Sequence, residues 1–185
     1  DAGCDAVVAE GFEAGGHNGR EETTTMVLIP AVSAAVDIPV LAAGGIATGR
    51  QMLAAMVLGA DGVQVGSRFV ASPEASSHIK FKEMVIAAQE GDTVLSLKQL
   101  TPVRLMKNNF FDQVQEAEKK CASTDELQKL LGKGRAKRGM FEGNLDEGEL
   151  EIGQVSTIIK NIKPAAEIVH EMYKEYQDAL KLPVK

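Results

Sequence analysis

The sequence predicts an α/β fold, and two observations lead to that prediction. Within the first 70 residues, a short apolar run that ends in glycine is followed by a helix-like segment, and this pattern occurs three times. The apolar runs are continuous rather than alternating, which is typical of strands buried on both faces of a parallel sheet. Strand and helix repeats with short connections are typical of α/β proteins.

Each strand and helix of this first part has its own signal. Strands are expected over the three apolar runs, at Ala6–Glu10, Pro39–Ala43 and Gly62–Val65. A helix is expected over Thr24–Val36, where apolar residues recur at helical spacing. A second helix is expected over Arg50–Leu58, with Thr48 as its N-cap and Gly59 as its stop signal.

The remainder of the chain is more charged and mostly helical. Helices are expected at Ser76–Gln89, Asp112–Lys120, Thr124–Leu131 (capped by Thr124) and Pro164–Leu180, and an irregular strand at Thr93–Leu100. The packing face of the last helix is predicted to comprise Ala165, Ile168, Val169, Met172, Tyr173 and Tyr176. A basic block at Lys133–Phe141 and an acidic block at Gly143–Gly153 are interpreted as solvated surface. We therefore divide the chain into residues 1–75 and 76–185.

Composition excludes several classes of function. The chain has 185 residues, a net charge of −6 and 4% aromatic residues, which argues against nucleic-acid binding. It contains no apolar run of about 18 residues, so no membrane association is expected. Cys4 and Cys121 form no disulfide framework, which favours the cytoplasm. The three histidines lack metal-ligand spacing, so no metal is expected, and His78 and His170 are interpreted as structural.

A glycine-rich segment follows the first predicted strand. It contains Gly15, Gly16 and Gly19 around His17. Glycine lets a backbone pass close to a ligand, and histidine exchanges a proton near neutral pH. The local motif is equally consistent with a reaction centre and with a tight turn that carries a surface histidine.

Two further glycine-rich strand ends favour the reaction centre. Gly44-Gly45 follows the second predicted strand, and Gly66-Ser67 follows the third. Free backbone N–H groups at the start of a helix bind phosphate well, and the hydroxyl of Ser67 adds a donor. In a βα barrel, such loops often form a phosphate site. The spacing of these glycines matches neither a dinucleotide fingerprint nor a P-loop.

Three sequence blocks resemble one known family. They are Ala9–Gly19 (AEGFEAGGHNG), Pro39–Ile46 (PVLAAGGI) and Gly62–Phe69 (GVQVGSRF). In order and spacing they resemble the nitronate monooxygenase family, which includes 2-nitropropane dioxygenase-like proteins and the FMN-dependent enoyl-acyl-carrier-protein reductase II. The resemblance continues through Arg104–Asn108 and Gly153-Gln154, so it spans nearly the whole chain.

The resemblance implies an FMN-binding (β/α)8 TIM barrel with a mostly helical substrate-covering region. By matching position, His17 would be the catalytic histidine. The residues that would bind FMN are Gly15 and Gly16 beside the flavin and Ala43, Gly44, Gly45, Gly66 and Ser67 around its phosphate. Only about three barrel strands are present, interpreted by analogy as the sixth to eighth, whereas a closed barrel needs eight. We therefore expect the C-terminal part of a barrel, without its N-terminal half.

Two reactions remain open under this resemblance. One is the reduction of enoyl-acyl-carrier-protein thioesters by NAD(P)H in fatty acid synthesis, and the other is the oxidation of nitronates with oxygen. The glycine-rich and acidic C-terminal region resembles the enoyl reductase branch more closely. A third interpretation is an inactive fragment or a half-barrel subunit.

The expected partner is a small-molecule or acyl-carrier-protein-linked substrate, and the sequence leaves a homodimer open. Four basic residues could meet an acidic carrier protein, namely Lys80, Lys82, Arg104 and Lys107. Exposed basic residues are commonplace, so this interpretation is the less favoured one.

Overall fold

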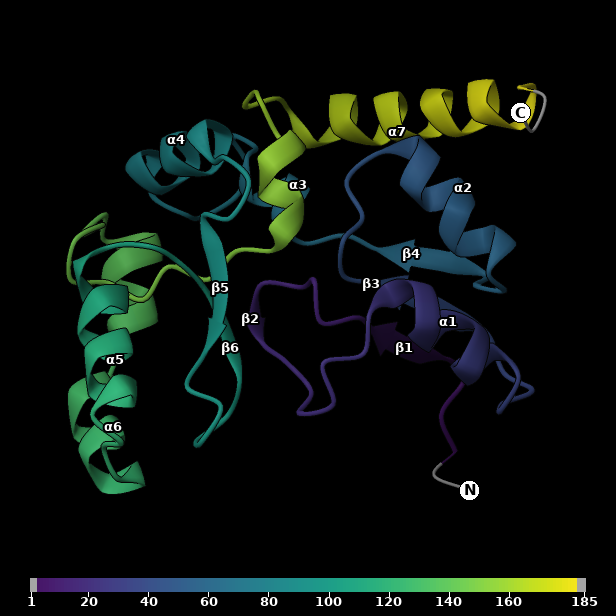
Figure 1. Cartoon of the computed structure of the whole chain (residues 1–185). Helices are drawn as coiled ribbons and strands as arrows, with labels where there is room; N and C mark the ends of the chain where they lie inside the picture. Colours follow the sequence, from purple (N-terminus) through teal and green to yellow (C-terminus); the bar gives the residue numbers. More distant parts are fainter. Residues whose placement is uncertain (1–2, 183–185) are drawn as a thin grey trace.

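The computed structural model describes residues 3–182 and confirms the α/β fold (Figure 1). Its first sheet contains β1 (Val7–Glu10), β3 (Val40–Ala43) and β4 (Gly62–Gln64). The strands are parallel and lie in the order β1-β3-β4, with Ala42 opposite both Ala9 and Val63. The three continuous apolar runs therefore form neighbouring strands, and their carboxyl ends meet at one edge of the sheet.

Three helices cover this sheet and one another. They are α1 (Thr25–Ser33), α2 (Gly49–Val57) and α7 (Ala165–Leu180). Ile29 of α1, Ala55 of α2 and Ile168 of α7 share one buried cluster with Ala42 of β3. Helix α7 crosses the top of the molecule in Figure 1 and packs on α2, although the two helices lie far apart in the sequence. The C-terminal helix is therefore part of the support for the first sheet.

The cap of α2 is confirmed, and that of α6 (Thr124–Leu131) differs by one residue. The Thr48 side chain accepts a hydrogen bond from the Gln51 backbone amide at 3.3 Å, and the Gln51 side chain accepts one from the Thr48 backbone amide at 3.1 Å. In α6 the same capping box is made by Ser123 and Glu126, so the predicted cap at Thr124 is wrong. The helix is better started by Ser123, because Glu126 then stands three residues later and completes the box.

A second sheet is antiparallel and joins the two parts of the chain. It contains β2 (Gly16–His17), β6 (Val103–Met106) and β5 (Thr93–Ser96), in that order. Strand β5 falls inside the extended segment predicted from the sequence, whereas β2 and β6 were not predicted. Strand β6 is buried at all four residues and includes Arg104, so its pattern is neither alternating nor uniformly apolar. The glycine-rich segment forms β2 only because β6 supplies its partner.

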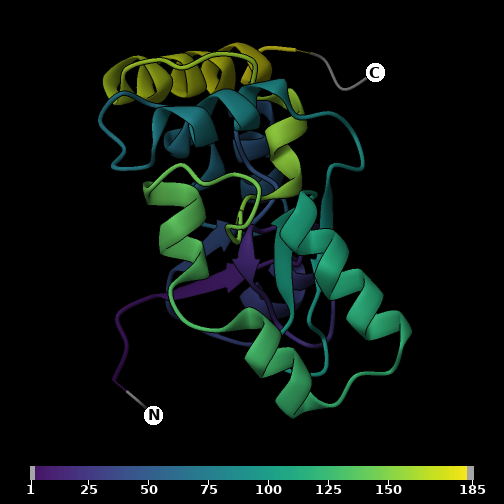
Figure 2. The ribbon, with the colours of Figure 1, turned by 90° about the vertical axis from the view of Figure 1, so that its left-hand side faces the viewer.

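The remaining elements surround the second sheet. They are α3 (Ser67–Val70), α4 (Ile79–Ala87), α5 (Asn109–Lys119), α6, a π-helix (Lys137–Phe141) and a 3₁₀ helix (Gln154–Ile158). Figure 2 shows α5 and α6 on the outside of this part of the molecule. Helix α4 begins later than predicted because His78 is extended, with ψ 144°, and its ring accepts from the Lys80 amide at 3.2 Å. Helix α5 begins earlier, because Asn108 caps it by accepting from the Phe111 amide at 2.8 Å.

The predicted packing face of α7 is only half buried. Ile168 and Met172 enter the core, but Val169 is 54% exposed and Tyr173 is 56% exposed. Among residues 3–182, no helix has both the length and the apolarity needed to cross a membrane.

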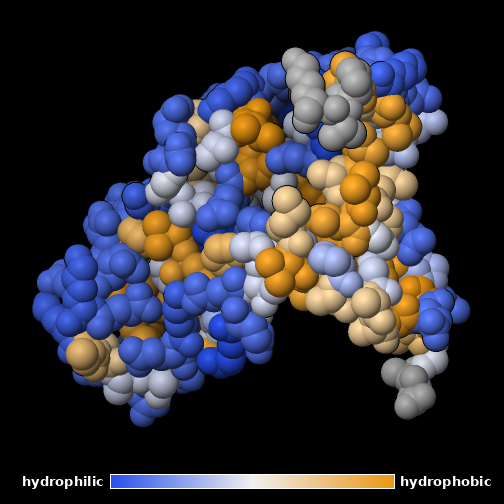
Figure 3. All heavy atoms as spheres, turned by 45° about the vertical axis from the view of Figure 1, so that its right-hand side comes forward, coloured by the Kyte–Doolittle hydropathy of each residue, from blue (hydrophilic) through white to orange (hydrophobic). Residues whose placement is uncertain are grey.

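Further apolar residues stay exposed around the first sheet. Val8 of β1, Met26 and Val27 of α1, and Val57 of α2 are all exposed. Figure 3 turns the side that carries α1 and α2 forward and shows apolar residues gathered there. A strand edge and an apolar surface left open in this way are typical of a sheet that lacks neighbouring strands.

Candidate functional site

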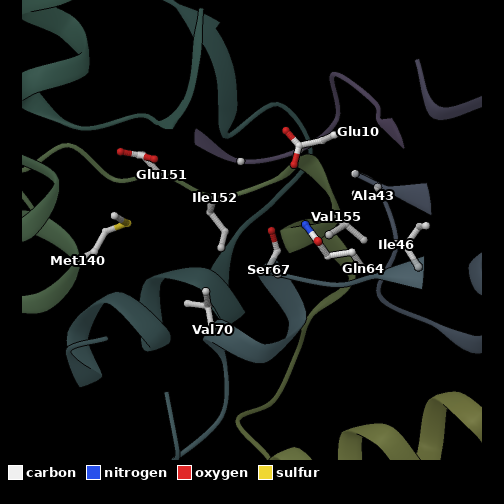
Figure 4. Close-up of a pocket in the computed structure, with 15 residues that line it drawn as sticks. Glu10, Ala43, Ile46, Gln64, Ser67, Val70, Met140, Glu151, Ile152 and Val155 are labelled. Carbon is white, nitrogen blue, oxygen red and sulfur yellow. The ribbon is translucent and has the colours of Figure 1, made fainter. Parts of the chain in front are cut away.

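A cavity of about 230 Å³ lies at the carboxyl ends of the three parallel strands (Figure 4). The strands contribute Glu10 from β1, Ala43 from β3 and Gln64 from β4. The C-terminal segment closes the other side with Met140 of the π-helix and Glu151, together with Ile152 and Val155. Ligands in open α/β sheets bind at this end of the strands, so the cavity is the candidate functional site.

Most of the residues proposed from the sequence to bind a cofactor meet in this cavity. Those that line it are Gly15, Ala43, Gly44, Gly45, Gly66 and Ser67. Gly16 and His17 do not line it; they form β2 immediately beyond Gly15. The three glycine-rich strand ends, widely separated in the sequence, are therefore brought to one place.

The loops after β3 and β4 present hydrogen-bond donors to the cavity. Gly45, Ile46 and Gly66 donate no backbone hydrogen bond to any residue within 3–182. The Oγ of Ser67 accepts a hydrogen bond from the Gly153 amide at 3.0 Å, which leaves its own proton free to donate. A set of unpaired amides with one hydroxyl is suited to an anion such as phosphate.

Two glycines at this site are required for different reasons. Gly44 has φ +85°, and a Cβ there would lie 2.5 Å from the carbonyl oxygen of Gly11, so the fold itself requires glycine. Gly66 has an ordinary φ of −104°, and a Cβ would have no atom within 4 Å. No described neighbour of Gly66 therefore demands glycine, and the space beside it is what a ligand would fill.

The loop that precedes His17 is held by two charged side chains. The buried guanidinium of Arg104 donates to the Phe12 carbonyl from Nε at 3.1 Å and from Nη2 at 2.7 Å, and it stacks on the Phe12 ring at 5.1 Å. The carboxylate of Glu13 accepts from the Thr25 amide at 3.0 and 3.1 Å and so caps α1. These contacts fix two consecutive residues, Phe12 and Glu13, in the turn that leads to Gly15.

His17 itself is exposed. As part of β2 it lies opposite Val103 of β6, with Gly16 opposite Arg104. Asn18, which follows it, is buried and donates from its side-chain amide to the carbonyls of Ala14 at 3.1 Å and Gly16 at 2.9 Å. The backbone around His17 is thus fixed while its imidazole remains free to meet a ligand.

The acidic block contains two carboxylates that are not on the surface. Glu149 is only 7% exposed, and Glu151 is half-buried. Burial, reinforced by the charge of Glu151 and opposed by Arg135, raises the pKa of Glu149 to about 7. Burial also raises the pKa of Glu151, whereas the charge of His17 lowers it. The interpretation of this block as solvated surface is wrong at these two residues, which alternate with buried Leu150 and Ile152.

Two of the four basic residues considered for a carrier-protein contact are buried. Arg104 is held against Phe12. The ammonium of Lys82 donates to the carbonyls of Ser72 at 2.6 Å and Ala75 at 2.7 Å. Lys80 and Lys107 remain exposed. The four residues therefore do not form one basic surface.

The sequence analysis missed the side of the cavity that comes from the C-terminal segment. Met140, Glu151, Ile152 and Val155 line it, together with Glu10 and Gln64 at the strand ends. Both could have been found, since Glu10 closes one apolar run and Gln64 is the one polar residue inside another. The alternation of Glu149, Leu150, Glu151 and Ile152 was the available signal for the other side.

Comparison with known proteins now adds to this geometry. Residues 1–175 match the family described as nitronate monooxygenase. The chain belongs to the nitronate monooxygenase family. A protein of Staphylococcus saprophyticus named a probable nitronate monooxygenase is 34% identical over 190 residues, which cover 97% of this chain and 53% of that protein. The chain therefore spans about half the length of such relatives.

Two solved structures resemble this family member over nearly its whole length. FabK from Thermotoga maritima is 42% identical with a TM-score of 0.90, and the match covers 97% of this chain and 57% of FabK. Nitroalkane oxidase from Streptomyces ansochromogenes is 29% identical with a TM-score of 0.79, and the match covers 97% of this chain and 53% of that protein. The α/β fold of this nitronate monooxygenase family member is thus shared by both.

Proposed function

We propose that the complete protein is an FMN-dependent oxidoreductase that reduces enoyl-acyl-carrier-protein thioesters with NAD(P)H in fatty acid synthesis. The observation that carries the proposal is the cavity at the strand ends, where three glycine-rich loops meet. Family membership supports a flavin, and the likeness to FabK, an enoyl-acyl-carrier-protein reductase II, supports the reaction.

The residues of the cavity fit the phosphate of FMN. Under the proposal, the amides of Gly45 and Gly66 and the hydroxyl of Ser67 hold the phosphate, with Ala43 and Gly44 shaping the loop. Gly15 and Gly16 would lie beside the flavin ring. The empty space beside Gly66 is the observation that best supports this fit, because no described neighbour requires glycine there.

His17 is proposed as the group that moves the proton. Bound FMN would supply hydride transfer. The imidazole of His17 would donate a proton at the carbonyl side of the thioester and regain one from water. The fixed backbone around His17 and its exposed ring suit this role, because the ring needs access to substrate without motion of the loop.

Nitronate oxidation with oxygen remains the second candidate. The family description and the relative from S. saprophyticus support it. In that reaction His17 would abstract the α-proton of a nitroalkane or orient its nitronate. The same histidine would serve both reactions, so His17 does not separate them.

We further propose that this chain supplies the last part of a (β/α)8 barrel. Strands β1, β3 and β4 would be the sixth to eighth, residues 1–75 would belong to the barrel, and residues 76–185 would cover the substrate. The exposed residues Val8, Met26 and Val27 support this, because an N-terminal half would bury such a surface. By itself the chain would then be an inactive fragment or a half-barrel subunit. The cytoplasmic location and the homodimer stay predictions.

One pair of assays tests the proposed function. The complete purified protein with FMN is given crotonyl thioester and NADH or NADPH, and separately a nitronate with oxygen. Consumption of NAD(P)H that depends on the thioester is the expected result. Oxygen consumption with nitronate alone, and none of NAD(P)H with thioester, would establish the second candidate instead.

A further inference from the structure

The carbonyl of Gly44 is held from outside the cavity. The hydroxyl of Thr25, at the first position of α1, donates a hydrogen bond to it at 3.0 Å. Thr25 does not line the cavity, whereas Gly44 and Gly45 do. Within residues 3–182, no other group donates to this carbonyl. One side chain therefore ties the loop after β3 to the start of α1.

This contact determines where the next amide points. The peptide bond between Gly44 and Gly45 is trans, so its C=O and its N–H point in opposite directions. The carbonyl is turned toward Thr25 and α1, and the amide of Gly45 is therefore turned away from α1. That amide has no acceptor among the described residues. The contact with Thr25 thus keeps a free donor on the side of the loop that faces the cavity.

The two glycines make such an anchor necessary. Gly44 has φ +85° and Gly45 has φ +70°, which suits both positions to glycine. Because neither residue carries a Cβ, the peptide between them can turn over with little steric hindrance. A peptide turned over in this way would aim its carbonyl, rather than the Gly45 amide, at a bound anion. The hydrogen bond from Thr25 opposes that rotation.

Thr25 is itself held in place by its neighbours. The carboxylate of Glu13 accepts from the Thr25 backbone amide at 3.0 and 3.1 Å. It also accepts from the Thr25 hydroxyl at 3.0 Å, so the hydroxyl shares its one proton between Glu13 and the Gly44 carbonyl. Gly11 leaves the room for this approach, since a Cβ there would lie 2.1 Å from Oγ1 of Thr25. The hydroxyl therefore has a fixed position against the loop.

We infer that Thr25 is a positioning residue for the anion site, which holds the Gly44–Gly45 peptide so that the Gly45 amide donates to the phosphate of FMN. This inference rests on the proposed function for the identity of the anion, but it does not depend on which substrate is turned over. Thr25 does not touch the phosphate. Gly66 and Ser67 belong to the loop after β4, so their contacts with the phosphate are independent of Thr25.

The first experiment compares FMN with riboflavin, which lacks the phosphate. The complete flavin-free protein is titrated with each flavin by fluorescence. T25V keeps the shape of the side chain and removes its hydroxyl. It is expected to raise the Kd of FMN about 10-fold, because a hydrogen bond to a charged group is lost or weakened, and to change the Kd of riboflavin less than about 2-fold.

Two variants control this comparison. T25S keeps the hydroxyl and should bind FMN as wild type does. T24V is the matched control, because the side chain of Thr24 makes no hydrogen bond at the start of α1, and it should leave both affinities unchanged. T25A removes the same hydroxyl with a smaller side chain, and the pattern expected of T25V is expected of it as well.

The possible outcomes separate the inference from the proposed function. An unchanged Kd of FMN in T25V and T25A, or an equal weakening of FMN and riboflavin, would overturn the inference, because the phosphate is then not the group affected. Wild type that binds FMN no more tightly than riboflavin would overturn the phosphate site of the proposed function, and the inference with it.

The second experiment observes the Gly45 amide directly by NMR. Glycine labelled with ¹³C at the carbonyl and ¹⁵N at the amide selects amides that follow another glycine, which in this chain are those of Gly16 and Gly45. In wild type, FMN is expected to move the Gly45 amide proton further downfield than riboflavin does, because only FMN offers a phosphate acceptor. In T25V this difference between the two flavins should be lost, while the Gly16 signal responds to both flavins as in wild type. The same difference at Gly45 in T25V as in wild type would overturn the inference.

Discussion

The hydroxyl of Ser67 and the amide of Gly153 are joined by a hydrogen bond of 3.0 Å, in which the amide donates. This contact connects the loop after β4 with the C-terminal segment that closes the cavity. It also determines the polarity of the hydroxyl, because the oxygen accepts from Gly153 and its proton is left to donate elsewhere. The Ser67 hydroxyl is therefore available to donate a hydrogen bond to an anion.

Replacing Ser67 with alanine tests whether this hydroxyl binds the phosphate. S67A is expected to raise the Kd of FMN about 10-fold to 100-fold, since hydrogen bonds to charged groups contribute about 1.5–3 kcal/mol. S33A is the matched control, because Ser33 donates to the Gly59 carbonyl at 2.8 Å on an exposed surface away from the cavity. Fluorescence titration of the flavin-free protein measures both. Equal affinity in S67A and wild type would remove Ser67 from the phosphate site.

Gly66 and Gly44 offer a contrast within one cavity. G66A adds a methyl group into empty space at an ordinary φ, so the flavin-free protein should be as stable as wild type or up to about 1 kcal/mol more stable. Its FMN affinity should fall at least about 10-fold, because the methyl group occupies the ligand's space.

G44A should instead lower the free energy of unfolding, since a Cβ there meets the Gly11 carbonyl at 2.5 Å. Denaturant unfolding and FMN titration of both variants separate the two effects. If G66A binds FMN normally, the phosphate lies elsewhere.

The parts of the structure that could be predicted depend on local patterns. The strands β1, β3 and β4 follow from continuous apolar runs, and the convergence of Gly45 and Ser67 follows because parallel strands end at one edge. The cap of α2 follows from Thr48 and Gln51, three residues apart. In each case the information lies within a few neighbouring residues.

The parts that could not be predicted depend on distant partners. Strand β2 has two residues and exists only through pairing with β6, so no sequence pattern near Gly16 predicts a strand there. The sequence predicts that Glu149 and Glu151 are exposed, because charged residues usually lie on the surface. Only their packing against the π-helix and β6 buries them. The C-terminal side of the cavity was therefore missed.

Arg104 should contribute strongly to stability. R104M leaves the part-buried Phe12 carbonyl without its donor and removes a cation–π contact, so we expect a loss of about 2–4 kcal/mol in the free energy of unfolding. R50M, at an exposed position of α2, should change stability by less than about 0.5 kcal/mol. Urea unfolding of the complete flavin-free protein measures the difference. Similar stability of the two variants would contradict the role given to Arg104.

His17 should matter for turnover but not for flavin binding. H17A is expected to keep the FMN affinity of wild type, because the phosphate is assigned to other loops, and to lower kcat about 10²-fold to 10⁴-fold. H170A, which changes an exposed histidine on α7, should leave kcat unchanged. Flavin absorbance and steady-state kinetics check both variants. Full turnover in H17A would remove the histidine from the mechanism.

Glu149 makes stability depend on pH. Its pKa is about 7 in the folded protein and near 4.5 in the unfolded chain, so the folded state binds the extra proton between these values. The stabilising effect is complete below about pH 4.5 and is lost as the pH rises through 7. The loss amounts to at most about 3 kcal/mol.

In E149Q this dependence of stability on pH should disappear, so the variant should be more stable than wild type at pH 8 but not at pH 5. Urea unfolding of the flavin-free protein at the two pH values measures this, and parallel pH profiles for E149Q and wild type would show that folding does not raise the pKa of Glu149.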